Sequence, residues 1–511
     1  MHRRPAALTW PSTVLTALCA LFIAGCSDIT EPRPEPEVAE GKGGKKGNQD
    51  LMRMVNLGSN IFSDTDLSFN RNQSCKSCHN PDWGWTGADP SQHATEGPNH
   101  GTFDDRFGGR KAMSAAYASQ APEFERRTGL NRPYIGGNFW DGRGTGGASI
   151  FGGMVLTPIE DQAQRPFVNP VEMALRDEAC VVRRIATSRY ADDYVEVFGD
   201  AILDIAFPAH IDDSCEAQEA QVDGEGNLLR LDLDGADGPD LPTDATWNTG
   251  VRGAVNAEYD NIAHAIGTMF EDSKILNAFS SDYDEWRETT SDPCTDRANL
   301  SKEAHRGMVI FSARNGGTGP CDGVEGLPDY LADVPGGSCN SCHENPLDLD
   351  VPFIGTDFEF DNIGVAPNPD NPGRNLAVDG PDLGLGGFLA SIGNPWGDAD
   401  QWKGAFRVPT VRNTAKGDGF GRTYMHNGVL KSLVEVVHFY NTARAPAEAV
   451  NCSLVTYQDA LGPNCWAEPE VAEGRVPPFL VGDLGLSPED EAAVLAFLRA
   501  LTDAGTRGPP R

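Results

Sequence analysis

The same five-residue pattern, C-x-x-C-H, occurs twice in this chain of 511 residues. The two copies comprise Cys75, Cys78, His79 and Cys339, Cys342, His343. Two thiols at this spacing, followed directly by a histidine, form the attachment pattern of a c-type haem: the thiols bind one porphyrin edge and the histidine reaches the iron. We therefore predict two covalent haems, with His79 and His343 as iron ligands.

Cysteines two residues apart also occur in thioredoxin-type redox sites and as one half of a zinc site. A zinc site needs a second such pair nearby, and neither copy has one. A redox pair has no need of the histidine that follows both copies. The repeated pattern therefore favours haem attachment over these alternatives.

The N-terminus has the pattern of an export signal. Arg3 and Arg4 supply positive charge, residues 14–24 are apolar, and the stretch "LFIAGCSD" places Cys26 directly behind small residues. This pattern resembles a bacterial lipoprotein signal, cleaved before Cys26, with a lipid on the cysteine sulfur. The alternative is an ordinary secretory signal with an incidental cysteine. We predict a signal peptide over residues 1–25.

Residues 26–49 are rich in Pro and Glu and then in Gly and Lys, which predicts a flexible tether. No later segment reaches about 18 continuous apolar residues, the length that a membrane-spanning helix needs. We expect an exported protein, lipid-anchored through Cys26 to the bacterial cell envelope, facing the periplasm and attached to the outer membrane.

The formal net charge is −34. Nucleic-acid binding requires clustered Lys and Arg, so the charge excludes that class of partner. A negative surface keeps an exported protein soluble, and it also attracts cationic partners such as a small basic electron donor.

Six cysteines remain after the two motifs, Cys26 and Cys19 of the signal are set aside. They are Cys180, Cys215, Cys294, Cys321, Cys452 and Cys465. An even number in an oxidising compartment suggests three disulfides. Cys452 and Cys465 flank a short loop and form the favoured pair, whereas the other pairings stay open.

Apolar residues recur at helical spacing in three places. Residues 50–70 and 301–312 predict helices that lead into the two motifs, and residues 486–503 predict a terminal helix with Ser487 as its N-cap. Helix, haem motif, long loops and terminal helix are typical of small cytochrome c domains. We predict a mostly α fold with two cytochrome c-like domains.

The predicted domain boundaries are residues 50–300 for an N-terminal peroxidatic haem domain and 301–511 for a C-terminal electron-transfer haem domain. Residues 209–250 are acidic and are interpreted as an inserted loop. Its "DLDGADGPD" stretch either binds calcium or is a solvated loop, since the closing Glu of a calcium loop is missing. Residues 345–400 are predicted to be a long loop that covers the second haem.

Between and beyond the motifs, four short segments carry a family resemblance. They are "NFWDGR" (138–143), "NPVEMA" (169–174), "FRVPTVRN" (406–413) and "YMHNG" (424–428). In this order, the chain resembles the bacterial diheme cytochrome c peroxidase superfamily from about residue 50 to residue 503. The resemblance implies two mostly α-helical cytochrome c-like domains with one haem each, and a first haem that reacts with hydrogen peroxide.

The resemblance also implies roles for residues around the first haem. Glu172 of "NPVEM" is placed over its distal face, where a carboxylate can move a proton between the two oxygens of peroxide. Gln162 and Pro166 are implied to shape the same pocket. Trp140 of "NFWDGR" is implied to lie between the haems as an electron relay. The alternatives are a helix-start acid for Glu172 and a core side chain for Trp140.

The second haem decides the branch of the family. Where the classical peroxidases place a methionine, fourteen residues after His426, this chain has Tyr440. A tyrosine there marks the MauG-like branch, in which the phenolate ligates the second iron and the haem pair stores two oxidising equivalents. A hard phenolate stabilises high-valent iron better than a thioether does. The alternatives are Met425, His438, or a tyrosine with no ligand role.

Two departures from the family pattern matter. Some peroxidases of the family use a loop histidine to cap the first haem, and His93 and His100 lie in the matching region without aligning cleanly, so we expect neither to be a ligand. Lys111 stands where the family has an asparagine that binds calcium between the haems. Calcium is possible but not favoured.

These residues predict an oxidoreductase that reacts with hydrogen peroxide at the first haem and oxidises an external donor or partner protein through the second. Trp83 and Trp85, beside the first motif, either carry oxidising equivalents outward or pack against the haem. One alternative is a classical peroxidase that reduces hydrogen peroxide to water with a small cytochrome or copper donor. Another is a non-catalytic diheme electron carrier.

Overall fold

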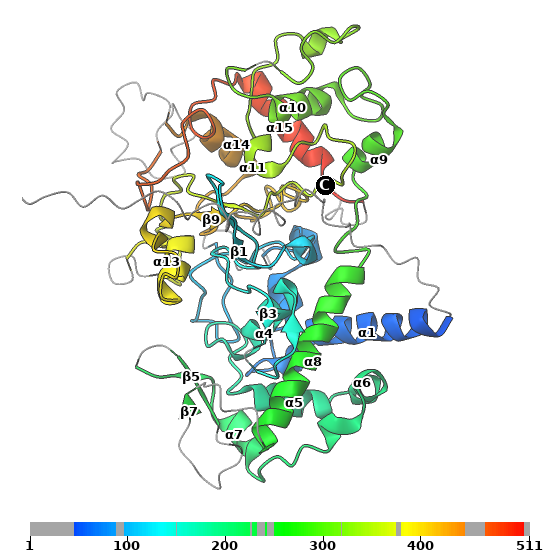
Figure 1. Ribbon diagram of the computed structural model, residues 1–511, viewed down its shortest axis with the longest axis vertical. Helices are drawn as coiled ribbons and strands as arrows, with labels where there is room; N and C mark the ends of the chain where they lie inside the picture. The colour runs from blue at the N-terminus through cyan, green and yellow to red at the C-terminus, as the bar shows by residue number, and fades with distance from the viewer. Residues whose placement is uncertain are drawn as a thin grey trace, which may run out of the picture. The chain divides into compact units, whose positions relative to one another are not determined.

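Helices provide most of the regular structure, and the strands are short (Figure 1). The computed structural model describes residues 45–87, 97–149, 151–224, 227–231, 233, 241–242, 250–317, 319–374, 380–444 and 466–504. Several predicted features lie outside these residues. They are the signal peptide with Cys26, most of the tether, His93, most of "DLDGADGPD", and the pair Cys452 and Cys465. The mostly α prediction is confirmed.

The helices of the N-terminal part are α1 (Lys45–Ser63), α2 (Cys75–Cys78), α4 (Pro158–Val168), α5 (Glu178–Ala186), α6 (Ala191–Phe198), α7 (Ile211–Ala217) and α8 (Gly250–Asp272). Those of the C-terminal part are α9 (Asp282–Thr289), α10 (Lys302–Ser312), α11 (Asn340–His343), α13 (Gly384–Ser391), α14 (Leu433–Thr442) and α15 (Pro488–Ala500). The 3-10 turns η2 (Pro81–Trp83) and η6 (Ala399–Trp402) follow the first motif and α13.

All the strands pair antiparallel in small sheets. The pairs are β1 (Glu125–Arg126) with β2 (Tyr134–Ile135), β3 (Gly147–Ala148) with β4 (Val155–Leu156), and β8 (Phe360–Asp361) with β9 (Phe406–Arg407). A three-stranded sheet has the order β5 (Gln221–Val222), β6 (Leu228–Arg230) and β7 (Leu241–Pro242). These sheets are too small to form a core and serve to pin loops together.

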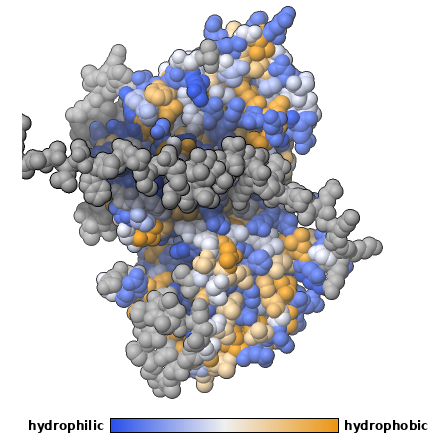
Figure 2. Space-filling view, viewed as in Figure 1, coloured by the Kyte–Doolittle hydropathy of each residue, from blue (hydrophilic) through white to orange (hydrophobic). Residues whose placement is uncertain are grey.

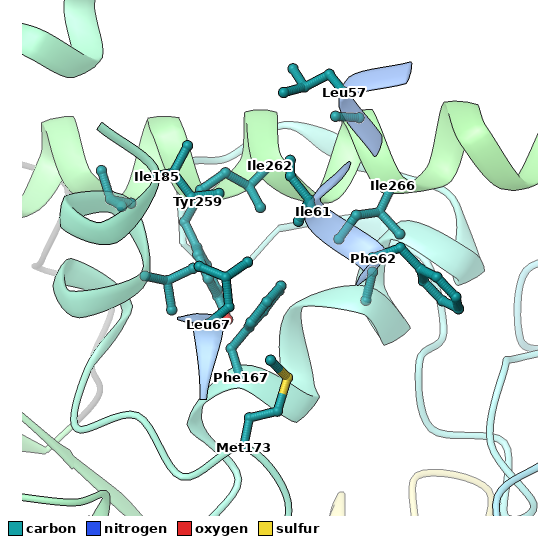
Figure 3. Close-up of a cluster of buried hydrophobic side chains, with 14 of the residues drawn as sticks. Leu57, Ile61, Phe62, Leu67, Phe167, Met173, Ile185, Tyr259, Ile262 and Ile266 are labelled. Carbon is teal, nitrogen blue, oxygen red and sulfur yellow. The ribbon is translucent and has the colours of Figure 1, made fainter. Parts of the chain in front are cut away.

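The first hydrophobic core packs α1, α4 and α5 against α8 (Figure 3). Its centre includes Leu57, Ile61, Leu67, Phe167, Ile185 and Ile262. Helix α1 crosses α8 so closely that a Cβ at Gly58 would clash with the backbone of Ala265. This crossing fixes the end of α1 and therefore the position at which the first C-x-x-C-H motif begins.

The second hydrophobic core packs α9, α10 and α14 against α15. Helix α15 begins at the predicted N-cap, where the Ser487 hydroxyl accepts the amide of Asp490. A Cβ at Gly307 of α10 would clash with the backbone of Ala493, so these two helices also pack with their backbones in close approach. The predicted helices before the second motif and at the C-terminus are both confirmed.

Buried polar contacts join residues from the two cores. The Tyr117 hydroxyl donates to Asp503 Oδ2 over 2.7 Å, and Arg412 Nη2 lies 3.1 Å from Asp503 Oδ1. Arg412 and Asp503 are both almost completely buried. Residues 52–511 group as one compact unit, separate from a unit that ends at Leu51, and the domain division at residues 300 and 301 stays a prediction.

Two segments that were expected to be loops contain regular structure. The acidic segment 209–250 includes α7 and the sheet of β5, β6 and β7, because Asp177 Oδ2 accepts the amide of Leu231 over 2.7 Å and Arg230 pairs with Glu178. The glycine-rich "GLGGFLAS" is helix α13, because Leu385 and Leu389 are fully buried in a small aromatic cluster. Tertiary burial overrides the weak helix propensity of glycine.

Helix α1 begins at Lys45, inside the segment predicted as tether.

The structure has two disulfides whose pairings the sequence had left undecided. They join Cys180 to Cys215 and Cys294 to Cys321. No helix within the described ranges is long and apolar enough to cross a bilayer. On the face drawn in Figure 2, hydrophobic side chains are scattered among hydrophilic ones wherever grey atoms do not cover it.

Candidate haem sites

The first cavity brings together all the residues predicted around the first haem. Its wall includes Cys75, Cys78, His79, Trp140, Gln162, Pro166 and Glu172. Gln162 and Pro166 are four residues apart on α4 and therefore share one face of that helix. Glu172 follows on the turn after α4, opposite the segment that carries the motif. Residues separated by nearly a hundred positions thus surround a single space.

His79 is oriented to present one ring nitrogen as a ligand. Its Nδ1 lies 3.1 Å from the carbonyl oxygen of Trp85. A carbonyl only accepts hydrogen bonds, so Nδ1 carries the proton and Nε2 keeps a free electron pair. Burial lowers the pKa of His79, which keeps the ring neutral and able to bind a metal. A metal-binding histidine is normally oriented in this way, with one ring nitrogen bonded to a carbonyl and the other left for the metal.

The thiols of the first motif do not resemble reactive redox cysteines. Cys75 and Cys78 form no disulfide. Burial raises the pKa of Cys75 to about 12 and that of Cys78 to about 11, whereas a reactive thiol needs a depressed pKa. No group of three His, Cys, Asp or Glu side chains suited to a metal ion occurs in the described part of the chain. The geometry fits attachment of an organic group better than a redox or zinc site.

Glu172 presents an unpaired carboxylate to the first cavity. Its side chain forms no hydrogen bond or ion pair within the described ranges and lines the cavity wall. Burial raises the pKa of Glu172 to about 7, although the positive charge of Arg143 acts in the opposite direction. A carboxyl group with this pKa exchanges a proton readily near neutral pH, as a general acid and base must.

The second cavity has the same plan on its motif side. Cys339, Cys342 and His343 line it, and His343 Nδ1 lies 2.9 Å from the carbonyl oxygen of Gly355. The same argument as for His79 leaves Nε2 of His343 free to bind a metal. Most of the remaining wall is apolar, which suits a flat hydrophobic ring.

Helix α14 decides which of the proposed second ligands faces this cavity. Leu433, Val436, Val437 and Tyr440 all line the wall, and their spacing places them on one face of the helix. His438 precedes Tyr440 by two residues, about 200° around the helix axis. Its Nδ1 lies 3.0 Å from Glu491 Oε1 and its ring packs on Trp466, so His438 faces away.

Tyr440 and Met425 are the two remaining ligand candidates on that wall. The Tyr440 hydroxyl has no hydrogen-bond partner among the described residues. Burial raises the pKa of this hydroxyl. Buried tyrosine hydroxyls normally have a partner, so a free one that faces a cavity indicates that the cavity supplies the partner. The sulfur of Met425 is only a weak hydrogen-bond acceptor and needs no hydrogen-bond partner.

Trp140 lines both cavities. Its Nε1 donates to the Lys111 carbonyl over 2.7 Å, and its own carbonyl accepts the amide of Arg407 over 2.8 Å. The Lys111 amide in turn donates to the carbonyl of His426 over 2.7 Å, and the Trp140 and His426 rings are 6.4 Å apart. A short network of peptide hydrogen bonds therefore fixes the indole between the two spaces.

Arg407, which sequence reasoning did not single out, is 5% exposed and lines the second cavity. Among the described residues, its Nε and Nη1 have no hydrogen-bond partner, its Nη2 donates to the sulfur of Met113, and burial lowers its pKa to about 10. A buried guanidinium without an anionic partner costs about 1–3 kcal/mol or more. The two carboxylates of a haem would supply such anions. The only sequence feature that points to Arg407 is its place as the first arginine of "FRVPTVRN".

Three further expectations concern His100, the calcium position and the two motif-adjacent tryptophans. His100 lines the first cavity, and its Nδ1 lies 2.7 Å from the Gly101 carbonyl oxygen. That His100 does not bind the iron stays a prediction. The Lys111 side chain is buried and its Nζ donates to Thr86 Oγ1, so an amine stands where the family resemblance places a calcium-binding asparagine. Trp85 is buried and Trp83 packs on Gly417.

The chain is similar to known proteins along most of its length. Residues 52–220 match the family model of di-haem cytochrome c peroxidase. The chain is 27% identical over 454 residues to methylamine utilization protein MauG of Paracoccus denitrificans (strain Pd 1222), covering 88% of each protein. It is 22% identical over 446 residues to cytochrome-c peroxidase IdrP2 of Pseudomonas sp. (strain SCT), covering 85% of this chain and 83% of that one.

A solved structure has the same fold. The crystal structure of a single-residue variant of the diheme peroxidase BthA from Burkholderia thailandensis E264 aligns with a TM-score of 0.59 and 23% identity. The alignment covers 89% of this chain and 86% of that chain. The two proteins therefore share an overall fold.

Proposed function

We propose that this chain, which matches the di-haem cytochrome c peroxidase family over residues 52–220, reacts with hydrogen peroxide at the first cavity and oxidises an external electron donor or a partner protein through the second, as a MauG-like oxidase. The observation that carries this proposal is that Trp140 lines both cavities, with the Glu172 carboxylate on the first wall and the Tyr440 phenol on the second. One side of the molecule can then accept peroxide while the other exchanges electrons.

Each cavity has the residues that would hold a c-type haem. Two cysteines would attach the porphyrin edge, a histidine would offer Nε2 to the iron, and in the second cavity Arg407 would pair with the haem carboxylates. When bound, the haem supplies an iron centre at which the oxygen–oxygen bond of peroxide is cleaved and oxidising equivalents are held.

Glu172 is the proton-transfer group in this proposal. Its ionised carboxylate would take a proton from one oxygen of hydrogen peroxide and return it to the other, which would leave as water while the haem takes up the two oxidising equivalents. Burial has raised the pKa of Glu172 to about 7, so the carboxyl is both basic enough to take the proton and acidic enough to return it. Gln162 and Pro166, on the neighbouring face of α4, limit the space above the iron.

Tyr440 is the ligand that closes the second cavity. Its hydroxyl is unpartnered, shares the cavity with His343 and has a hard oxygen donor. Since an anionic phenolate favours oxidised iron, this ligand makes the second site suited to holding an oxidising equivalent. A thioether from Met425 at the same position would favour the classical peroxidase.

The experiment that tests the proposal adds stoichiometric hydrogen peroxide to the purified ferric protein without a reductant. A long-lived near-infrared band is the expected result for a MauG-like oxidase. A requirement for prior one-electron reduction would support the classical peroxidase instead. Two low-spin haems with no response to peroxide would overturn the proposal and leave an electron carrier.

The peroxide reaction is expected to depend on pH through Glu172. Only the ionised carboxylate accepts a proton, so below the pKa of about 7 the rate should fall roughly tenfold for each pH unit. Above that pKa the rate should reach a plateau. Stopped-flow measurement of the initial peroxide reaction between pH 5 and pH 9 checks this prediction. A flat profile would remove Glu172 from the proton transfer.

The substitution Tyr440→Phe is expected to change the spectrum of the second haem alone. Phenylalanine keeps the ring but loses the oxygen donor, so the iron loses its ligand while the first site stays as it was. Optical and electron paramagnetic resonance spectra measure the change. The matched control is Tyr424→Phe, because Tyr424 lines the same cavity but its hydroxyl donates to the Thr414 carbonyl over 3.0 Å. Identical spectra for both variants would refute the assignment.

A further inference from the structure

We propose that Tyr134 and Trp396 form a redox relay that leads from the second haem site to the protein surface, and that an electron-donating protein delivers electrons at Trp396. This inference deepens the proposed function and rests on it. It concerns a part of the molecule, the α13 segment beside β1 and β9, that the sequence had marked only as a covering loop (Figure 1).

The relay begins at a cysteine of the second motif. Arg132 Nη1 lies 3.5 Å from Cys342 Sγ and 2.7 Å from Asp361 Oδ2, and both Cys342 and Asp361 line the second cavity. Only Pro133 separates Arg132 from Tyr134 along the chain. A second connection runs through aromatic rings, because Tyr134 stacks on Phe124, which meets Phe360 edge to face, and Phe360 precedes Asp361. Two chains of neighbouring residues therefore lead from the cavity wall to the phenol.

The relay ends at an exposed indole. Tyr134 is fully buried, whereas Trp396, with its ring centroid 5.5 Å away, is 43% exposed. Trp402 lies 5.3 Å from Tyr134 on another side and is half-buried. Residues 391–397 around Trp396 are all exposed, so a partner protein can reach the indole edge. Tyrosine and tryptophan are the side chains most easily oxidised by one electron, and close spacing keeps each transfer short.

Tyr134 also has the proton acceptor that its oxidation needs. Its hydroxyl donates to Asp398 Oδ1 over 2.6 Å, and the other oxygen of Asp398 pairs with Arg126 over 3.1 Å. A phenol that loses an electron becomes strongly acidic and must release its proton. A carboxylate already in hydrogen-bond contact accepts that proton without any rearrangement.

Each passage along the relay moves one electron. Tyr134 gives an electron to the oxidant that hydrogen peroxide leaves at the second cavity, and its proton moves to Asp398. Trp396 then reduces the Tyr134 radical, the proton returns, and the donor protein reduces Trp396. Two passages supply the two electrons with which hydrogen peroxide and two protons from water become two molecules of water.

The donor is a one-electron protein donor with a basic surface. The chain has a net charge of −34, so a basic partner is attracted and an acidic one is repelled. Exposed tryptophan is also a side chain that protein interfaces favour. A reduced, small, basic cytochrome c is therefore the probe for the experiment.

The test compares the wild type with Trp396→Phe and Tyr134→Phe in the haem-loaded protein. Both variants should keep the single-turnover reaction with peroxide and lose about tenfold or more in the rate at which the reduced cytochrome is oxidised. Peroxide without a donor should oxidise Trp396 in the wild type, seen as added oxygen in its peptide by mass spectrometry, and this should disappear in Tyr134→Phe. Phe479→Leu, which alters another exposed aromatic residue, is the control and should match the wild type.

The outcomes separate this inference from the proposed function. A wild-type protein that does not react with peroxide overturns the proposed function itself. A wild type that reacts normally, together with variants that oxidise the cytochrome at the wild-type rate and a Trp396 peptide that stays unmodified, overturns the relay alone. Thermal unfolding of each variant shows whether the packing of the aromatic cluster has been preserved.

Discussion

Replacing Glu172 with glutamine is expected to slow the reaction with hydrogen peroxide by about 10²- to 10⁴-fold, the contribution of a positioned general acid and base. Glutamine keeps the size of the side chain and its place on the cavity wall, but it cannot take a proton. The haems should remain attached, because Glu172 is not part of either C-x-x-C-H motif. Stopped-flow spectroscopy with a range of peroxide concentrations measures the effect.

The pH profile makes this prediction specific. If Glu172 is the proton acceptor, the residual rate of Glu172→Gln should no longer change near pH 7, where burial places the pKa of the native carboxyl. The matched control is Glu160→Gln. Glu160 is also buried and lies on α4, but its carboxylate faces His264, with Oε1 2.6 Å from Nδ1, and does not line the cavity. Equal loss in both variants would indicate a structural effect.

Replacing Trp140 with phenylalanine is expected to uncouple the two sites. Phenylalanine fills most of the space of the indole but is much harder to oxidise, and it cannot donate to the Lys111 carbonyl. We expect the first haem to react with peroxide at close to the wild-type rate, while steady-state oxidation of an electron donor falls by about tenfold or more. The near-infrared band after peroxide addition should also be lost.

The control for this variant is Trp466→Phe. Trp466 packs against His438 and Phe439 and lines neither cavity, so its replacement removes an indole without touching the space between the haems. A Trp140→Phe protein with normal steady-state turnover would show that electrons do not pass through the indole. Slow peroxide reaction in that variant would instead indicate that Trp140 shapes the first cavity.

Much of the fold followed from local patterns. The helices of residues 301–312 and 486–503 were predicted from apolar spacing, and Ser487 caps the latter as expected. The predictions that failed were those of long loops. Helix α13 is rich in glycine and forms because Leu385 and Leu389 are buried against distant aromatic residues, which no local propensity reveals.

The residues of the candidate sites also divide into those that the sequence could predict and those that only the fold reveals. Cys75, Cys78 and His79, like their second copies, are close in sequence, so a shared role could be predicted for them without a fold. Arg407 was missed because its importance lies in being buried without an anionic partner, which is a property of the folded environment and not of the residue type. The relay residues Tyr134 and Trp396 were missed for the same reason, since they are 262 positions apart, the difference of their residue numbers, and meet only through packing.

The sequence by itself determined the two C-x-x-C-H motifs, the helices that precede them, and the presence of a tyrosine where a sulfur ligand was the alternative. These features depend on residues within one or two helical turns of each other, where geometry follows directly from spacing. Only the tertiary structure decided that Tyr440 faces the second cavity while His438 faces Glu491, and that Trp140 borders both cavities. Side-chain direction depends on which face of a helix is buried, and burial is set by contacts between segments far apart in the chain.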